Sequence, residues 1–177
     1  AEPHAWLATQ TDALLRFHAR AAPDRAEGGF WWVDAAGEPI HAKGKQLWIA
    51  ARHTYGFAVG ALLGRPGYRP LAEAGVAALR SGALRDRANG GWFWAVAADG
   101  VAVDDTKQAY GHAFVVIAAA AAVVAGIDAR DLLDDALTVL DERFWDEDER
   151  MFVDEWNRDF TVLDSYRGQN ANMHLVE

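Results

Sequence analysis

Two kinds of hydrophobic pattern alternate along the chain. In one kind, apolar side chains recur at helical spacing and charged residues fill the positions between them, which is typical of surface helices. These amphipathic segments are residues 4–21, 70–87 and 128–145. In the other kind, residues 46–64 contain one formal charge, Arg52, and residues 108–126 contain none. Because a helix that is apolar on every face is buried, the pattern predicts outer helices that alternate with inner ones.

An aromatic sequence lies between each outer helix and the inner helix that follows, and it repeats. Its first copy is Gly28-Gly29-Phe30-Trp31-Trp32, and its second is Gly90-Gly91-Trp92-Phe93-Trp94. A degenerate third copy, at nearly the same spacing, is Met151-Phe152-Val153-Asp154-Glu155-Trp156. Polar turn residues follow each copy. Aromatic residues that flank such turns predict short strands or small hairpins, gathered at one rim of the molecule.

A unit of about 60 residues with an outer helix, an aromatic loop and an inner helix can build an open array or a closed ring. An open array would leave one face of the inner helices in water, so their apolar character favours the ring. The sequence therefore predicts an all-α fold of the (α/α) barrel type. The chain holds about three units, whereas barrels of the (α/α)6 type have six helix pairs. We expect residues 1–177 to be a single domain, the N-terminal half of such a barrel, with the remainder truncated.

Charge and composition limit the partners. The chain has 26 acidic and 17 basic residues, a net charge of −9 and no basic stripe, so nucleic acids and anionic membranes are poor partners. It has no cysteine, which excludes disulfides and thiol catalysis and fits a cytoplasmic location. Residues 108–126 are long enough to cross a membrane. We do not interpret them so, because they are rich in Ala, contain Gln108 and His112, and belong to the repeat.

Arg52 is a candidate functional residue because arginine is almost never fully buried without a partner. Trp48 lies four residues earlier, on the same helical face. A guanidinium beside an indole can hold sugar hydroxyls or a developing enolate oxygen. The alternative is a structural ion pair inside the barrel, with Asp105 or Glu177 as the partner.

Asn170 and His174 form a second candidate pair, four residues apart near the end of the sequence. A neutral imidazole can take or give a proton near neutrality, and an Asn one turn away can orient a hydroxyl group. Tyr110 is placed to bond a ligand from the second inner helix. For His174 and Tyr110 alike, ordinary core packing is the alternative.

No pattern for a metal or a nucleotide is present. The acidic run Asp146-Glu147-Asp148-Glu149 lacks the glycine and the spaced ligands of a calcium loop, and it predicts a solvated turn. No His-x-x-x-His or cysteine pattern argues for a metal, and no phosphate-binding glycine motif follows a strand. We therefore expect no metal and no cofactor.

Three segments together resemble the N-acylglucosamine 2-epimerase superfamily, nearest to its D-mannose isomerase and sulfoquinovose isomerase branch. They are Leu47-Trp48-Ile49-Ala50-Ala51-Arg52, Lys107-Gln108-Ala109-Tyr110-Gly111-His112-Ala113-Phe114 and Tyr166-Arg167-Gly168-Gln169-Asn170-Ala171-Asn172-Met173-His174. The segments occur in the family's order and span nearly the whole chain. The resemblance implies an (α/α)6 barrel of about twice this length.

The resemblance also implies a cofactor-independent isomerase that moves a proton between C2 and C1 of a free sugar through a cis-enediolate. Arg52 and His174 would be catalytic, with Arg52 stabilising the intermediate, and Trp48, Tyr110 and Asn170 would bind the monosaccharide. Further histidines and a glutamate would come from a second half. We therefore expect the 177-residue chain alone to be poorly active. Its oligomeric state is left open.

Three alternatives remain open at this point. A 2-epimerase of the same superfamily would return the proton to C2. A glycoside hydrolase would need two opposed carboxylates, and the two inner helices have none in their middles. A non-catalytic carbohydrate-binding fragment would keep the pocket without turnover.

Overall fold

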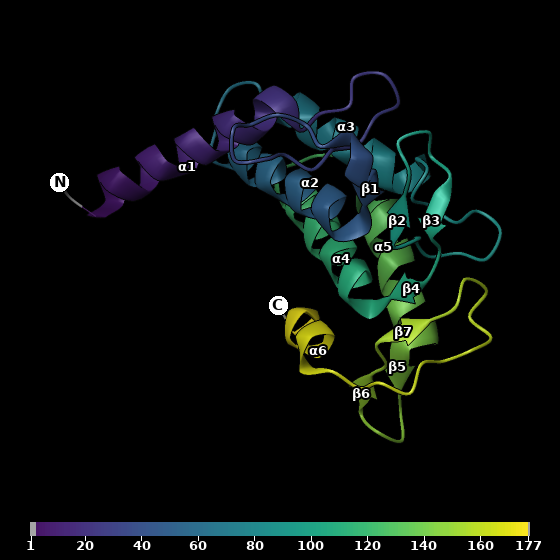
Figure 1. Cartoon of the computed structure of the whole chain (residues 1–177). Coiled ribbons are helices and arrows are strands. Elements are labelled where there is room, and N and C mark those ends of the chain that lie inside the picture. The colour runs from purple at the N-terminus through teal and green to yellow at the C-terminus, as the bar shows by residue number, and fades with distance from the viewer. Residues whose placement is uncertain (1–2, 177) are drawn as a thin grey trace.

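A computed structural model of the chain describes residues 3–176 and shows helices in two layers (Figure 1). The outer helices are α1 (Pro3–Ala21), α3 (Tyr68–Ser81) and α5 (Arg130–Val139). The inner helices are α2 (Leu47–Leu62), α4 (Ala109–Val124) and α6 (Gln169–Leu175). Helix α2 packs on α3 and α4, and α4 packs on α5 and α6. The predicted alternation of outer and inner helices is confirmed.

Two outer helices end earlier than their sequence pattern suggests. Helix α3 stops at Ser81, because Gly82 turns to an extended conformation while its N–H still bonds the Ala78 carbonyl at 2.8 Å. Helix α5 ends at Val139 and passes into a π-helical turn, Leu140–Phe144. A short 3-10 helix, His41–Lys43, precedes the first inner helix. The apolar periodicity continues through such irregular turns, so it overestimates helix length.

Short strands join the loops into three small antiparallel sheets. Strands β1 (Lys45–Gln46), β2 (Ala95–Val96) and β3 (Ala102–Asp104) form the first sheet in that order. Strand β4 (Lys107–Gln108) pairs with β7 (Glu155–Trp156), and β5 (Trp145–Asp146) pairs with β6 (Met151–Phe152). Strands β1 and β4 lie directly before α2 and α4. Their pairing ties the start of each of these inner helices to the aromatic loop of the next unit.

The helices pack closely where side chains are small. Helices α2 and α3 meet at Gly75, where an added Cβ would lie 2.2 Å from the Thr54 Oγ1 atom. Large buried side chains fill the rest of the core and come from the aromatic loops as well as the helices, including Phe30, Phe57 and Trp92. The aromatic loops are therefore part of the core and fix the inner helices at this rim.

The inner helices are not buried on all sides, and that part of the expectation is wrong. Arg52 and Tyr55 of α2 are exposed, and Val124 of α4 is 68% exposed. The helix pairs form an open arc, in which nothing among residues 3–176 packs across the inner face (Figure 1). Within the same residues, no helix has both the length and the apolar character needed to cross a membrane.

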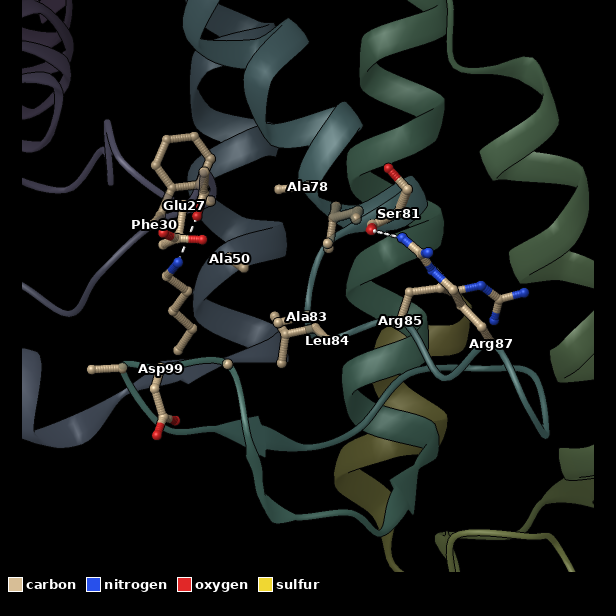
Figure 2. A pocket seen from close by; sticks show the side chains of 17 residues that line it. Glu27, Phe30, Ala50, Ala78, Ser81, Ala83, Leu84, Arg85, Arg87 and Asp99 are labelled. Carbon is tan, nitrogen blue, oxygen red and sulfur yellow. Dashed lines mark hydrogen bonds between the residues drawn. The ribbon is translucent and has the colours of Figure 1, made fainter.

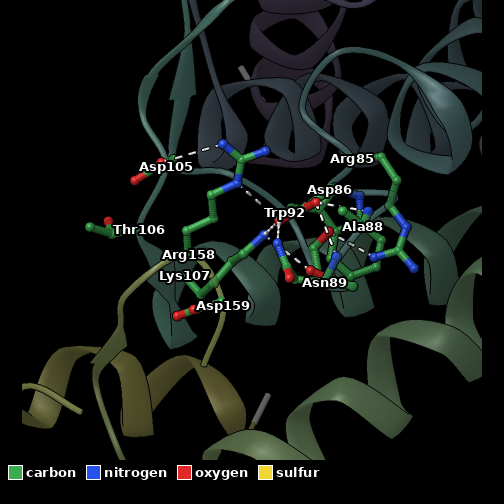
Figure 3. A network of polar contacts seen from close by, with 12 residues as sticks. Arg85, Asp86, Ala88, Asn89, Trp92, Asp105, Thr106, Lys107, Arg158 and Asp159 are labelled. Atoms are coloured by element: carbon green, nitrogen blue, oxygen red, sulfur yellow. Dashed lines mark hydrogen bonds and ion pairs between the residues drawn. The ribbon is translucent and has the colours of Figure 1, made fainter. Parts of the chain in front are cut away.

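A buried ion pair closes the aromatic loop in each of the first two units. In the first unit, Lys45 Nζ lies 2.6 Å from Asp24 Oδ2, and in the second, Lys107 Nζ lies 2.8 Å from Asp86 Oδ2 (Figure 3). Each lysine also donates to the carbonyl of the first glycine of its Gly-Gly pair, at 2.7 and 3.0 Å. We call these two pairs the Asp–Lys clasps.

The second clasp tolerates burial because its carboxylate is well bonded. Burial alone would raise the pKa of Asp86, but the bonds from Lys107 and from the side chain and backbone of Asn89 outweigh it and lower the pKa to about 2. Removing Asp86 would leave the buried Lys107 ammonium without its ion-pair partner. The sequence carried a signal for the clasps, since the lysine follows its aspartate at the same spacing in both copies of the repeat.

Candidate functional site

The five predicted site residues occupy equivalent positions of the repeat. The second residues of the three inner helices are Trp48, Tyr110 and Asn170. The sixth residues, one turn further along, are Arg52, Phe114 and His174. Residues four apart share one face of a helix, so each inner helix presents two side chains to the same side.

The structure brings most of these side chains into one cluster. Arg52 donates from Nη2 to the Tyr110 hydroxyl at 3.0 Å. Its guanidinium carbon lies 4.3 Å from the centre of the Phe114 ring and 5.0 Å from that of Trp48, within cation–π range. The His174 ring lies 4.7 Å from Phe114 and 5.2 Å from Tyr110, between ring centres. We call these five side chains the arginine–histidine cluster.

The environment of Arg52 differs from the expectation. The residue is exposed, and none of the carboxylates among residues 3–176 lies within ion-pair distance of it. Asp105, one of the two partners considered, lies 3.8 Å from Arg158 instead. Glu177, the other, lies outside the described residues. The guanidinium contacts two aromatic rings and a hydroxyl and is otherwise exposed.

A cavity of about 560 Å³ adjoins the cluster. Three of the predicted residues line this cavity, together with aromatic, amide and carboxylate side chains from the strands and loops. The lining residues are Trp48, Trp94, Gln108, Tyr110, Asp154, Glu155, Asp164, Tyr166, Asn170 and Ala171. Flat rings beside hydrogen-bonding groups suit a small ligand with many hydroxyls.

Three carboxylates of this cavity were not predicted, because they lie outside the helical patterns of the sequence. Glu155 is in β7, Asp154 directly precedes it, and Asp164 is in the following loop. Burial raises the pKa of Glu155, and repulsion from the nearby carboxylates adds to that shift. One signal was available: the repeat position that carries Trp32 and Trp94 in the first two units carries Asp154 in the third.

The two residues predicted to be catalytic line neighbouring hollows. His174 contributes to one of about 480 Å³, between α4, α5 and α6. Arg52 contributes to one of about 390 Å³ against α1, and Trp48 lines both this hollow and the 560 Å³ cavity. Four members of the arginine–histidine cluster, Trp48, Arg52, Tyr110 and His174, therefore each line at least one of these three hollows.

A further cavity of about 450 Å³ lies between the first aromatic loop, the end of α3 and the β2–β3 turn, and none of the predicted residues lines it (Figure 2). Its cations already have partners. Lys45 is in the first clasp, Arg85 donates to the Gly91 carbonyl at 2.7 Å, and Arg87 donates to the Ser81 carbonyl at 2.6 Å. Among residues 3–176, no group of three or more His, Asp or Glu side chains is placed to hold a metal ion.

The fold consists of repeated helix pairs, and polar and aromatic residues of the inner helices lie beside a sugar-sized cavity. These features define the class of protein to which the fold belongs. The chain is a member of the N-acylglucosamine 2-epimerase (GlcNAc 2-epimerase) family, whose profile matches residues 28–177. The resemblance inferred from the three sequence segments is therefore confirmed.

The relatives include isomerases and epimerases of sugars. The chain is 44% identical over 174 residues to a D-mannose isomerase of Thermobifida fusca and 41% identical over 175 residues to one of Pseudomonas cannabina pv. alisalensis. These alignments cover 98% of this chain, but 42% and 41% of the two enzymes. The chain thus spans less than half the length of the relatives it matches.

Solved structures agree on the fold. A crystal structure of D-mannose isomerase superposes with a TM-score of 0.88 at 28% identity, over 97% of this chain and 44% of that one. Cellobiose 2-epimerase from Spirochaeta thermophila superposes with a TM-score of 0.83 at 24% identity, over 97% and 47% of the two chains.

Proposed function

We propose that this chain is the N-terminal half of an (α/α)6 barrel and supplies one wall of the active site of a sugar isomerase. The substrate class is a free monosaccharide of the D-mannose and D-fructose type. The observation that carries the proposal is the arginine–histidine cluster, because it places a cation and an imidazole together beside a cavity suited to hydroxyl groups. The D-mannose isomerases matched over nearly the whole chain support the choice of reaction.

The proposed reaction is a proton transfer between neighbouring carbons. A base removes the proton from C2 of the open-chain aldose, the C–H electrons form a C1–C2 double bond, and the C1 carbonyl oxygen becomes negative. The abstracted proton exchanges with solvent on the base, which then delivers a proton to C1, while the hydroxyl proton of O2 passes to O1 and leaves a ketone at C2. Arg52 stabilises the negative oxygen of the enediolate, as a preplaced positive charge does most effectively away from bulk water.

The remaining residues divide the other tasks. His174 exchanges a proton with the sugar, since an imidazole can act as either acid or base near neutrality. Trp48 packs against the sugar ring, and Tyr110 and Asn170 bond its hydroxyls. Phe114 contacts both Arg52 and His174, with the guanidinium 4.3 Å and the imidazole 4.7 Å from its ring centre.

Two alternatives differ in outcome. A 2-epimerase would use the same residues and return the proton to C2. The chain shares its fold with a cellobiose 2-epimerase, so we test this reaction as well. A non-catalytic fragment would bind a sugar through the cavity residues without proton transfer. Neither alternative calls for a metal or a cofactor.

The test follows D-mannose by NMR in deuterated water. An isomerase yields D-fructose labelled at C1, and an epimerase yields D-glucose labelled at C2. We expect the 177-residue chain alone to turn over slowly or not at all. We expect turnover to return when the chain replaces the matching 42% of the Thermobifida fusca enzyme. Robust turnover by the chain alone would contradict the half-barrel proposal, and a folded but inactive chimera would contradict the reaction.

Arg52→Gln in the active chimera should lower kcat by at least 100-fold, a usual effect of removing one group that stabilises an oxyanion. The matched control is Arg80→Gln, which removes an arginine on the outer layer that pairs with Asp131 at 2.6 Å. The control should keep full activity, because Arg80 lies on α3, away from the inner face.

A further inference from the structure

One side chain in each of the last two units joins the inner helix to its aromatic loop. His112 is the fourth residue of α4 and is fully buried. Its Nε2 accepts the backbone N–H of Trp92 at 3.2 Å, and its Nδ1 donates to the Gln108 carbonyl at 2.7 Å. The imidazole thus connects the aromatic loop to the residue just before the helix.

Asn172 is the fourth residue of α6 and makes the same connection with an amide. Its Oδ1 accepts the backbone N–H of Phe152 at 2.9 Å, and its Nδ2 donates to the carbonyls of Phe152 at 2.9 Å and Gly168 at 3.2 Å. Phe152 follows Trp92, and Gly168 follows Gln108, at the same spacing at which Asn172 follows His112. The two side chains differ chemically but join equivalent backbone atoms.

Two polar side chains join helix α6 to the rest of its unit. Apart from Asn172, the polar anchor at its start is Asp154, whose Oδ2 accepts the N–H of Gly168 at 2.6 Å. Gly168 precedes the helix, so this bond holds its entry. Asn172 lies within the helix, so its bonds to Phe152 set the rotation of the helix about its axis.

We propose that Asn172 is a positioning residue that aims Asn170 and His174. Asn170 lies two positions before Asn172 and His174 two positions after it, both on the side of the helix that faces Tyr110 and the cavity. With Asn172 pinned to the loop strand, the imidazole of His174 is kept against Phe114 and Tyr110. The consequence for catalysis rests on the proposed function, whereas the geometric claim does not.

The geometric claim is tested by NMR on the chain itself, through nuclear Overhauser effects between the His174 ring and the rings of Phe114 and Tyr110. Asn172→Ala should lose these effects while the amide spectrum of α2 and α3 is unchanged. Asn172→His should restore them, because an imidazole in the second unit makes two of the three bonds, to the loop N–H and to the carbonyl before the helix. Asn170→Ala is the matched control on the same helix, and it should keep them because it leaves the bonds to Phe152 intact.

Retention of the ring contacts in Asn172→Ala would overturn the proposal. If Asn172→Ala does not fold, Asn172→His decides: ring contacts like those of the wild type support the proposal, and their absence overturns it. In the active chimera, Asn172→Ala should lower kcat on the order of 100-fold, as a displacement of about 1 Å of a reacting group can do. Asn172→His should recover most of that loss. Without turnover in the chimera, the proposed function fails while the NMR result still decides the role of Asn172.

Discussion

The second and third units of the repeat use the same backbone design with different chemistry. In the second, Asp86 accepts the N–H groups of Ala88 and Asn89 and pairs with buried Lys107. In the third, Asp146 accepts the N–H groups of the equivalent residues, Asp148 and Glu149, at 3.0 Å. The turn is therefore shared by the two units, although the ion pair beneath it is not.

The residue that matches Lys107 in the third unit is Arg167, which follows Asp146 at the same spacing at which Lys107 follows Asp86. Arg167 donates to the carbonyls of Asp164 and Tyr166 at 2.8 and 2.9 Å instead of closing a clasp. The third unit anchors its inner helix through Asn172 and Asp154 and places three carboxylates at the cavity. Buried ion pairs therefore hold the first two units together, whereas the third unit has polar groups around the candidate site in their place.

The largest effect should come from breaking a clasp. Asp86→Ala leaves the Lys107 ammonium buried without its partner, and we expect the free energy of unfolding to fall by about 3–5 kcal/mol. Asp146→Ala removes only the turn bonds of a partly exposed carboxylate, and should cost about 1 kcal/mol. Urea unfolding of both variants measures the difference. Equal losses would show that the clasp is not what distinguishes the two units.

The buried imidazole of the second unit should make stability depend on pH. Burial lowers the pKa of His112 to about 3, so the folded protein keeps it neutral while the unfolded chain binds a proton below about 6.5. Stability should therefore be lost as the pH falls from about 6.5 toward 3, by about 2 kcal/mol at pH 5.

His112→Asn places the side chain of the third unit in the second and removes this titration. The variant should show a smaller loss of unfolding free energy between pH 7 and 5 than the wild type, whatever its stability at pH 7. The half-buried His53, with a pKa lowered to about 4 by burial and by His18, remains in both proteins as a shared background. An unchanged pH dependence would contradict the burial of a neutral His112.

A smaller effect should follow from adding a methyl group beside His112. Gly91 has a φ of 63°, and a Cβ there would lie 2.8 Å from the His112 Nε2 atom. Gly91→Ala should cost about 1–3 kcal/mol of unfolding free energy through backbone strain and crowding. The third unit carries Met151 at the equivalent position, so Met151→Ala should cost less. The reverse order would show that the loops of the two units are not built alike.

The smallest effect should come from an exposed ion pair between units. Arg80 of α3 contacts Asp131 of α5 at 2.6 Å, with side chains 36% and 62% exposed. Arg80→Ala should cost less than about 1 kcal/mol, and the loss should shrink in high salt. Thermal unfolding at low and high ionic strength measures both. A loss as large as that of Asp86→Ala would remove the distinction between the clasps and surface pairs.

Much of the fold was predictable because each unit of the repeat shows the same local sequence patterns. The apolar periodicity marked five helices, and the repeated aromatic sequence marked the loops between them. Helix ends were less predictable, because Gly82 and the π-helical turn 140–144 interrupt patterns that continue in sequence. The burial of the inner helices was overestimated, since composition does not say which neighbours a helix has within an open arc.

Within the candidate site, the amino-acid sequence is enough to pair residues along one helix, because helical spacing requires that Trp48 and Arg52, or Asn170 and His174, share a face. The contact of Arg52 with Tyr110, far along the chain, and the placement of Glu155 and its neighbours at the cavity depend on the packing of the helices and loops. Periodicity constrains neighbours along one element, whereas a contact between elements depends on how the whole chain packs.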